Sequence, residues 1–333
     1  MFEFNYDLNL LIKTMDMSIH ELADELHFDV PTISNWLNGK YLPDPRSKED
    51  VYDYAFKNNI KINLSYDYGL RQLAKRDGFT VLYHGSKTGI KDDIDLNCSK
   101  DNNDFGKGFY CGENYEQSAM FICDYKNSNI YSFGLYTKGL KKYEYEIDNE
   151  WMLTIAYYRG LLDEYKNSKK LISIINKSKD VDYIIAPIAN NRMFDIIGEF
   201  VNGNISDEAC CKALVALDLG KQYVLKTNRA VEKLGLYKEH YLCNAEKEYY
   251  RTSKISSNKK RYESIKNFRS KYRNGKYIEE LLWENLIMIV CWCVKYKEEF
   301  LRSHYYNATQ VLQYLLKGIW ILFQHIVWIE NRF

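Results

Sequence analysis

Residues 103–123 read NDFGKGFYCGENYEQSAMFIC and combine a glycine-rich turn with a helix-like continuation. Two glycines separated by one residue and followed by Phe109 and Tyr110 are typical of a tight turn that packs aromatic side chains. From Tyr115 to Tyr125 the apolar residues recur at helical spacing. The stretch therefore predicts a turn followed by a helix.

Around this stretch, short apolar runs and helical segments follow one another without a regular βαβ alternation, which predicts an α+β domain. Neither GxGxxG nor GxxxxGK[ST] occurs, so no Rossmann dinucleotide site or P-loop is indicated. The strand-like runs are 80–84, 129–136, 182–188 and 222–227, and the further helical stretches are 151–162, 193–201 and 206–217.

Three separated elements carry a family resemblance. LYHGS (82–86), the FGKGFY turn and KQYVLKT (221–227) resemble, in order and spacing, the signature elements of ADP-ribosyltransferases of the diphtheria-toxin and poly(ADP-ribose) polymerase branch. More narrowly, SKDNNDFGKGFY, EWMLTIAYYRG (150–160) and DYIIAPIANN (182–191) resemble the bacterial domain-of-unknown-function 3990 family, which is ADP-ribosyltransferase-like. The resemblance spans 79–240. It implies a split antiparallel β-sheet, NAD⁺ as co-substrate and no metal.

Cleaving the bond between nicotinamide and ribose in NAD⁺ develops oxocarbenium character on the sugar, so a catalyst must hold the leaving group and stabilise the ribose. The resemblance implies that Tyr110 and Phe121 stack on the nicotinamide ring from either side. It also implies that Ser118 and the backbone of Gly85, with Ser86 beside it in the His-Gly-Ser element, bind the cofactor and its carboxamide.

The resemblance places His84 on the adenosine ribose and Gln222 at the third signature position, where polymerases have Glu. Gln accepts hydrogen bonds but cannot act as a base near neutral pH, so we expect transfer of a single ADP-ribose, to a phosphate or another acceptor, rather than polymer growth. Lys100 would meet the NAD⁺ diphosphate, or simply be solvated. His84 could equally be a core or capping histidine. Arg159 and Asp182 belong to the narrower resemblance, and we expect them to be paired structurally.

The N-terminal segment predicts two short helices joined by a turn. Ser18 with Glu21 three residues later forms a capping box, and a second helix starts near Pro31 and ends at Asn38-Gly39. The stretch MSIHELADELHFDVPTISNWLNGKYLPDP resembles the helix-turn-helix of phage repressors, the Xre or Cro type, whose second helix enters the major groove. By this resemblance the residues that face DNA are Thr32, Asn35 and Lys40.

The formal charge of +1 hides an uneven distribution. Residues 1–65 carry 6 basic and 11 acidic groups, which argues against tight DNA binding by this part alone and leaves a protein-docking module as the alternative. Residues 251–276 carry ten basic groups and one acid, so a nucleic-acid partner is better sought there. Residues 277–333 predict a small helical subdomain, which we expect to pack against the transferase-like domain. It also faintly resembles the small helical proteins encoded beside such transferases, so a small antitoxin-like protein is a candidate partner.

The domain prediction is a helix-turn-helix over 1–65, a transferase-like domain over 79–245, a basic linker over 251–276 and a helical extension over 277–333. The start MFEFNYDLNLLIK lacks the pattern of a signal peptide, and the longest apolar run, 319–329, is shorter than the ~20 residues of a membrane span, so we expect a cytoplasmic protein with no membrane partner. The eight cysteines lack zinc-site spacing.

These features predict a bacterial or phage mono-ADP-ribosyltransferase, toxin-like or defence-associated, with NAD⁺ as co-substrate and an unknown acceptor. Two other interpretations stay open. One is a DNA-binding regulator whose transferase fold is inert or only senses NAD⁺. The other is a docking protein that recruits nucleic acid or an acidic partner through its basic stretch.

Overall fold

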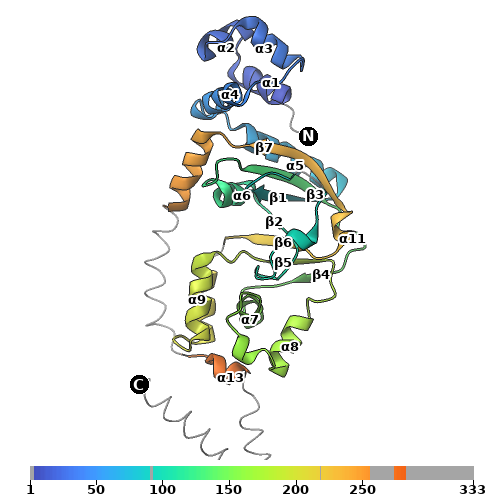
Figure 1. Cartoon of the computed structure of the whole chain (residues 1–333), viewed down its shortest axis with the longest axis vertical. Coiled ribbons are helices and arrows are strands. Elements are labelled where there is room, and N and C mark those ends of the chain that lie inside the picture. The colour runs from blue at the N-terminus through green and yellow to red at the C-terminus, as the bar shows by residue number, and fades with distance from the viewer. Residues whose placement is uncertain (1–3, 91–92, 218, 256–273, 283–333) are drawn as a thin grey trace, which may run out of the picture. The chain divides into compact units, whose positions relative to one another are not determined.

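The computed structural model describes four stretches of the chain, 4–90, 93–217, 219–255 and 274–282 (Figure 1). The chain divides into two compact units, Met1–Leu282 and Trp283–Phe333. The second unit lies outside the described residues. So do most of the predicted basic linker and all but the start of the predicted helical extension.

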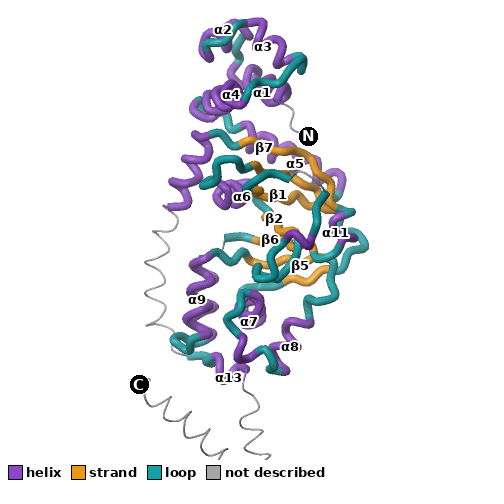
Figure 2. The backbone as a smooth tube through the Cα atoms, in the orientation of Figure 1, coloured by secondary structure: helices purple, strands orange, loops and turns teal. Residues whose placement is uncertain are grey.

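A seven-stranded sheet in the order β4-β5-β6-β2-β1-β3-β7 is the scaffold of the first unit (labelled in Figure 1, with strands orange in Figure 2). Neighbouring strands run antiparallel, except that β4 and β5 are parallel. β1 and β3 are in register over seven pairs, whereas β1 and β2 are in register at one, Tyr83 with Gly112. Two half-sheets, β4-β5-β6-β2 and β1-β3-β7, therefore meet at a single residue pair. The strands are β1 (Thr80–Ser86), β2 (Phe109–Gly112), β3 (Asn129–Leu135), β4 (Lys142–Glu144), β5 (Tyr183–Pro187), β6 (Lys221–Leu225) and β7 (Leu234–Tyr241).

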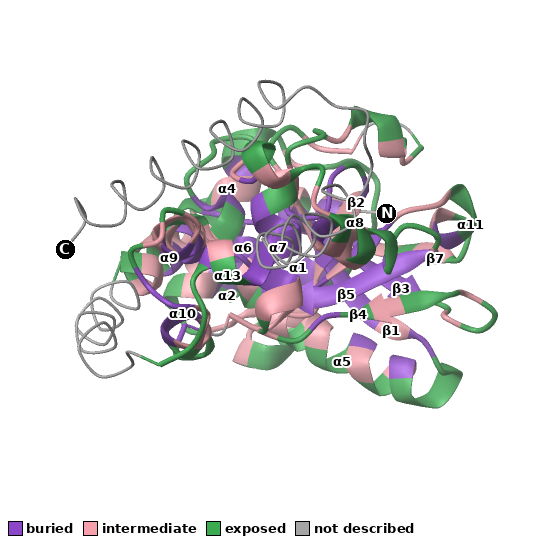
Figure 3. Cartoon of the chain, turned by 90° about the horizontal axis from the view of Figure 1, so that it is seen from below, coloured by how far each residue is buried: buried purple, intermediate pink, exposed green. Residues whose placement is uncertain are grey.

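Alternate strand residues pack into different cores, because successive side chains point to opposite faces of a sheet. Val81 packs with α5 and α6, Val224 packs with α7, α9 and α10, and Leu82 and Leu225 share a third cluster. β5 is buried along its whole length, as its purple colour in Figure 3 shows. The helices are α5 (Ile62–Asp77), α6 (Tyr115–Ile122), α7 (Asn149–Tyr158), α8 (Lys169–Asn176), α9 (Asn191–Val201), α10 (Asp207–Val215), α11 (Asn228–Val231) and α13 (Ile278–Leu282), and residues 244–255 are also helical.

The predicted α+β class is confirmed, and each predicted strand and helix of the transferase-like segment overlaps an observed one. Three strands were not predicted, namely β2, β4 and β7. None of the helices within the described stretches is long and apolar enough to cross a membrane.

Four helices precede α5. They are α1 (Phe4–Met15), α2 (Ile19–Leu26), α3 (Val30–Leu37) and α4 (Pro45–Lys57). The predicted capping box is present, since Ser18 accepts from the N–H of Glu21 and the Glu21 carboxylate accepts from the N–H of Ser18. Ile33 and Trp36 are buried on α3, and Gly39 follows with a φ of +65°. The predicted helix, turn and helix are thus confirmed as local structure.

Of these helices, α1 and α4 contact β7. Lys238 of β7 forms an ion pair with Asp7 of α1, and each of the two side chains is 6% exposed. Asp7 also accepts a 2.6 Å hydrogen bond from the Tyr52 hydroxyl of α4. The boundary expected at residue 65 falls inside α5. The N-terminal helices and the sheet belong to the same compact unit.

Candidate active site

The FGKGFY turn fixes the ring of Tyr110. The Tyr110 hydroxyl donates to the carbonyl of Gly106 at 2.6 Å and accepts from the N–H of Phe105 at 3.1 Å. Gly106 has a φ of +70°, and a Cβ there would lie 2.9 Å from the Tyr158 ring. Lys226 Nζ donates to the Phe105 carbonyl at 2.6 Å, and burial lowers the pKa of Lys226 to about 8. The turn is therefore held on both sides, and Tyr110 has little freedom to rotate.

His84, on β1, is held in one tautomer. Its Nδ1 lies 2.7 Å from the carbonyl oxygen of Tyr110, and its ring stacks on Phe109 at 4.4 Å between centroids. Burial lowers the pKa of His84, so the imidazole is neutral near pH 7. A carbonyl only accepts, so Nδ1 carries the proton and Nε2 is an acceptor. Among the described residues Nε2 has no protein partner, and it is not one of the fully buried unpaired atoms.

Gly85 brings β1 close to α6. A Cβ on Gly85 would lie 2.7 Å from Cγ2 of Ile122 and 3.1 Å from the carbonyl oxygen of Ser118. The Ser118 hydroxyl donates to the carbonyl of Tyr83 at 3.2 Å, which leaves its oxygen able to accept. Ser86, half-buried, ends the strand opposite Asn129. The glycine thus sets the distance between the His-Gly-Ser element and Ser118.

Replacing Gly85 with Ala should therefore destabilise the fold, by about 1–3 kcal/mol, because overpacking forces Ile122 or the α6 backbone to move. Urea unfolding of the full chain measures the change. Gly69→Ala on α5 is the matched control, since nothing lies within 4 Å of a Cβ there, and it should be neutral or slightly stabilising. Equal effects of the two substitutions would contradict the close approach of β1 and α6.

Gln222, at the start of β6, makes two contacts through its amide nitrogen. Nε2 donates to Oδ2 of Asp104 at 3.0 Å and to the carbonyl of Pro187 at 3.1 Å. Asp104 in turn accepts on Oδ1 from Nε and Nη2 of Arg159, at 2.9 and 2.5 Å. Arg159 and Asp182 are both paired structurally, as expected, the latter with a backbone N–H and a threonine hydroxyl. Sequence reasoning missed Asp104, although it directly precedes the FGKGFY turn.

Strand register brings most of the predicted site together. Gln222 lies opposite Gly112 on β2, and Gly112 lies opposite Tyr83, the residue before His84. A Cβ on Gly112 would lie 3.6 Å from Ser118 Oγ. The residues that converge where the half-sheets meet are His84, Gly85, Tyr110, Ser118 and Gln222.

Two predicted residues stand apart from this group. Phe121 is 61% exposed on α6, makes no ring contact with Tyr110 in the described part of the chain, and has Lys87 Nζ 5.6 Å from its ring centroid. Lys100 is exposed on the loop before the FGKGFY turn. Gln117, beside Ser118, was not predicted, and its Oε1 is buried without a hydrogen-bond partner among the described residues.

The predicted DNA-facing residues lie on and just after α3. Thr32 is half-buried and Lys40 is exposed, with its Nζ 5.6 Å from the ring centroid of Tyr41. The Asn35 amide donates to the Tyr41 hydroxyl at 2.7 Å, so base contacts by Asn35 would require it to give up this bond. DNA recognition by these residues stays a prediction.

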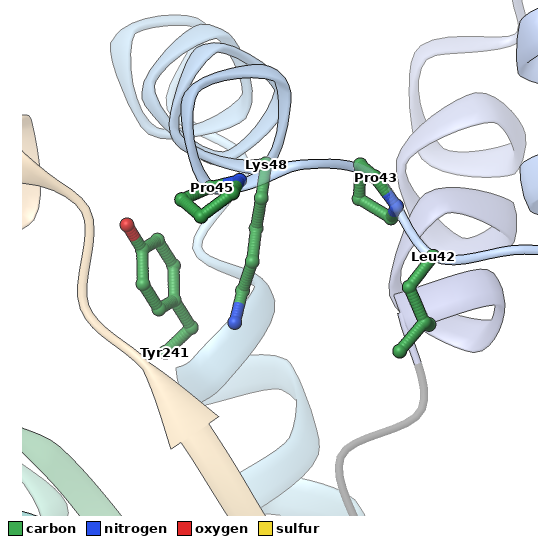
Figure 4. Close-up of a pocket in the computed structure, with 5 residues that line it drawn as sticks. All are labelled: Leu42, Pro43, Pro45, Lys48 and Tyr241. Carbon is green, nitrogen blue, oxygen red and sulfur yellow. The ribbon is translucent and has the colours of Figure 1, made fainter.

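Two other features could suggest a site. A hollow of about 250 Å³ between the start of α4 and β7 has Lys48 Nζ 4.0 Å from the ring centroid of Tyr241 (Figure 4), and none of the predicted site residues lines it. Glu49, Asp53 and Cys243 place one ligand atom each within 4.8 Å of one another. Both carboxylates already accept backbone N–H groups at the start of the helix 244–255, which accounts for their positions without a metal.

Comparison with known proteins places part of the chain in a family of sequences. Residues 80–236, from β1 into β7, match the model of a family described as a protein of unknown function, DUF3990. No curated protein and no solved structure matches the chain. The resemblance expected over 79–240 is confirmed for this family, and the N-terminal helices lie outside the match.

Proposed function

We propose that the DUF3990 segment, residues 80–236, cleaves NAD⁺ between nicotinamide and ribose and transfers a single ADP-ribose to an acceptor. The observation that supports this most is the convergence of five predicted side chains or backbone positions where the half-sheets meet. They come from β1, β2, α6 and β6, and they are His84, Gly85, Tyr110, Ser118 and Gln222.

Two acceptor atoms in this group suit ribose hydroxyls. His84 Nε2 is an acceptor because Nδ1 carries the proton. The unprotonated nitrogen of an imidazole accepts hydrogen bonds from hydroxyl groups. Gln222 donates through Nε2 to two protein acceptors, which leaves Oε1 as the atom available to a ligand. In the proposal His84 binds the adenosine ribose and Gln222 orients the nicotinamide ribose.

The nicotinamide would be held by aromatic stacking and by its carboxamide. Tyr110 supplies a ring whose orientation is fixed by the Gly106 turn. The Ser118 oxygen can accept a carboxamide N–H while its own hydrogen points to the Tyr83 carbonyl. Phe121 lies three residues after Ser118, and in the proposal its exposed ring turns from its position beside Lys87 to cover the opposite face.

In the reaction, the C–N bond between ribose C1′ and nicotinamide breaks, and nicotinamide leaves with the bonding electron pair. C1′ then forms a bond to the acceptor, whose proton is released to solvent or to a base. Gln222 cannot remove that proton. Its place at the third signature position therefore favours one transfer on to an acceptor that is already nucleophilic, over repeated transfer on to ribose hydroxyls.

The direct test incubates the full chain with NAD⁺ labelled in the adenylate part and with cell extract, and measures nicotinamide release and label transfer. His84→Ala and Gln222→Ala should each lower nicotinamide release by about 10²-fold, since each removes a polar contact to the reacting substrate. His20→Ala on α2 and Gln72→Ala on α5 are matched controls, because both side chains are exposed and outside the site.

Wild-type protein that releases no nicotinamide and labels nothing would refute the transferase proposal, as would equal activity in the His84 and His20 variants. A growth defect on expression that disappears with Gln222→Ala would support a toxin-like or defence role. Mass spectrometry of labelled material then identifies the acceptor.

A further inference from the structure

We infer that Asp104 is a positioning residue for Gln222, whose amide it orients so that Oε1 is the atom presented to NAD⁺. The inference rests on the proposed function, and it gives a role to a residue of the SKDNNDFGKGFY stretch for which the resemblance implied none. It deepens the proposal by explaining how a glutamine can serve at a position where related enzymes use a carboxylate.

Asp104 is held rigidly enough to act in this way. It is 6% exposed, and both Nε and Nη2 of Arg159 donate to the same carboxylate oxygen, Oδ1. The Arg159 guanidinium also lies 5.1 Å from the ring centroid of Phe194. The second oxygen, Oδ2, is therefore left for Gln222 Nε2, which it meets at 3.0 Å. The Arg159 guanidinium compensates the negative charge of the buried Asp104 carboxylate.

The surroundings of Gln222 leave one amide orientation. Its two protein neighbours, the Arg159-paired carboxylate of Asp104 and the carbonyl of Pro187, accept hydrogen bonds and donate none. A flipped amide would bring Oε1 against both of these oxygens, which is repulsive, and would leave them without a donor. The hydrogen-bonding chemistry of these two neighbours therefore fixes Nε2 of Gln222 towards them and Oε1 away from them.

Orientation matters more for Gln than for Glu. A carboxylate has two equivalent acceptor oxygens, so either of them can face a ribose hydroxyl. Gln has one acceptor and one donor, so half of its orientations would present N–H groups to the ligand. Glutamine at 222 therefore needs a neighbour that accepts without donating, and Asp104 supplies it.

The test exchanges the two functional groups. Asp104→Asn keeps the shape, but because Arg159 donates twice to Oδ1, the oxygen of the new amide stays on Arg159 and its NH2 faces Gln222. That NH2 pairs only with Oε1 of Gln222 and so turns the acceptor away from the ligand, and kcat/KM for nicotinamide release should fall at least about tenfold. Adding Gln222→Glu lets the new amide at position 104 donate to one carboxylate oxygen while the other faces the ligand, although the Pro187 carbonyl loses the donor that it has in wild type. We expect this double variant to be at least about threefold more active than Asp104→Asn, without reaching wild type.

Two single variants complete the set. Gln222→Glu alone places two carboxylates about 3 Å apart, so one of them should hold a proton near neutrality and the activity should become pH-dependent. Asp101→Asn in the same loop is the matched control, because Asp101 is exposed and its ion pair with Lys107, at 3.7 Å, lies on the surface. It should behave as wild type.

A readout independent of activity is the solvent exchange of the Gln222 side-chain amide protons, followed by NMR in full chain labelled with ¹⁵N-glutamine and assigned by the loss of the peak in Gln222→Glu. Protection in wild type that is lost in Asp104→Asn supports the inference. Unprotected amide protons in wild type overturn it, and so does an active Asp104→Asn or a double variant no better than Asp104→Asn.

Failure of the proposed function has a different signature. Wild type would then release no nicotinamide while the Gln222 amide protons stay protected and respond to Asp104→Asn. In that result the orienting contact stands, and its purpose in NAD⁺ cleavage is refuted.

Discussion

Replacing Asp7 with Ala is expected to lower the free energy of unfolding by about 3–5 kcal/mol, because it leaves the Lys238 ammonium buried without its carboxylate. The pair is 6% exposed at both side chains, so water cannot replace the lost partner. The Tyr52 hydroxyl also loses its acceptor. Urea unfolding of the full chain, followed by circular dichroism, measures the change.

The loss of stability in Asp7→Ala should come from the unpaired charge left on Lys238, and not from the lost attraction between Asp7 and Lys238 itself. A double variant, Asp7→Leu with Lys238→Met, removes both charges and fills the space with apolar atoms, and it should recover most of the lost stability. Asp50→Ala is the surface control, since Asp50 is exposed on α4. If Asp7→Ala and Asp50→Ala shift the unfolding midpoint alike, α1 is not anchored on β7 in this way.

Replacing Glu246 with Gln is expected to stabilise the protein above pH 7 by up to about 3 kcal/mol. Burial raises the pKa of Glu246 from 4.5 to about 7, against the hydrogen bonds from Tyr115 and Asn63 that favour ionisation. Between pH 4.5 and 7 the native state keeps a proton that the unfolded chain has released. The free energy of unfolding should therefore fall as pH rises through this window, with the full contribution present below pH 4.5.

Gln cannot ionise, so the variant should lose this part of the pH dependence, and thermal unfolding at about pH 5, 6, 7 and 8 tests it. Glu248→Gln serves as the control in the same helix, because Glu248 is exposed and should keep the wild-type profile. A wild-type profile that is flat between about pH 5 and 7 would contradict a raised pKa at Glu246.

Features that depend on a few neighbouring residues were predictable. The capping box of Ser18 and Glu21 and the positive φ at Gly39 are local, and both are present. The strands β1, β3, β5 and β6 were predicted from their apolar runs. β7 was not, because LGLYKEHY carries Lys238 and His240, whose burial depends on partners more than 170 residues away. β4 has three residues, too few for a pattern.

The candidate site divides in the same way. The motif spacing that singled out His84, Ser118 and Gln222 is a property of the chain, and their convergence agrees with it. The orientation of the Gln222 amide is not a property of the local chain. It depends on Asp104, which is 118 residues away and directly precedes a turn that Lys226, the residue after β6, holds in place.

The 103–123 stretch thus specified a turn, an aromatic pair and a helix through local backbone preferences that operate in any fold. Which atom of Gln222 faces a ligand, which nitrogen of His84 carries a proton and why Gly85 must lack a Cβ were decided by tertiary structure. The physical reason is that hydrogen-bond partners and steric limits at these three positions come from other strands and helices, and only the packed chain brings those groups within reach.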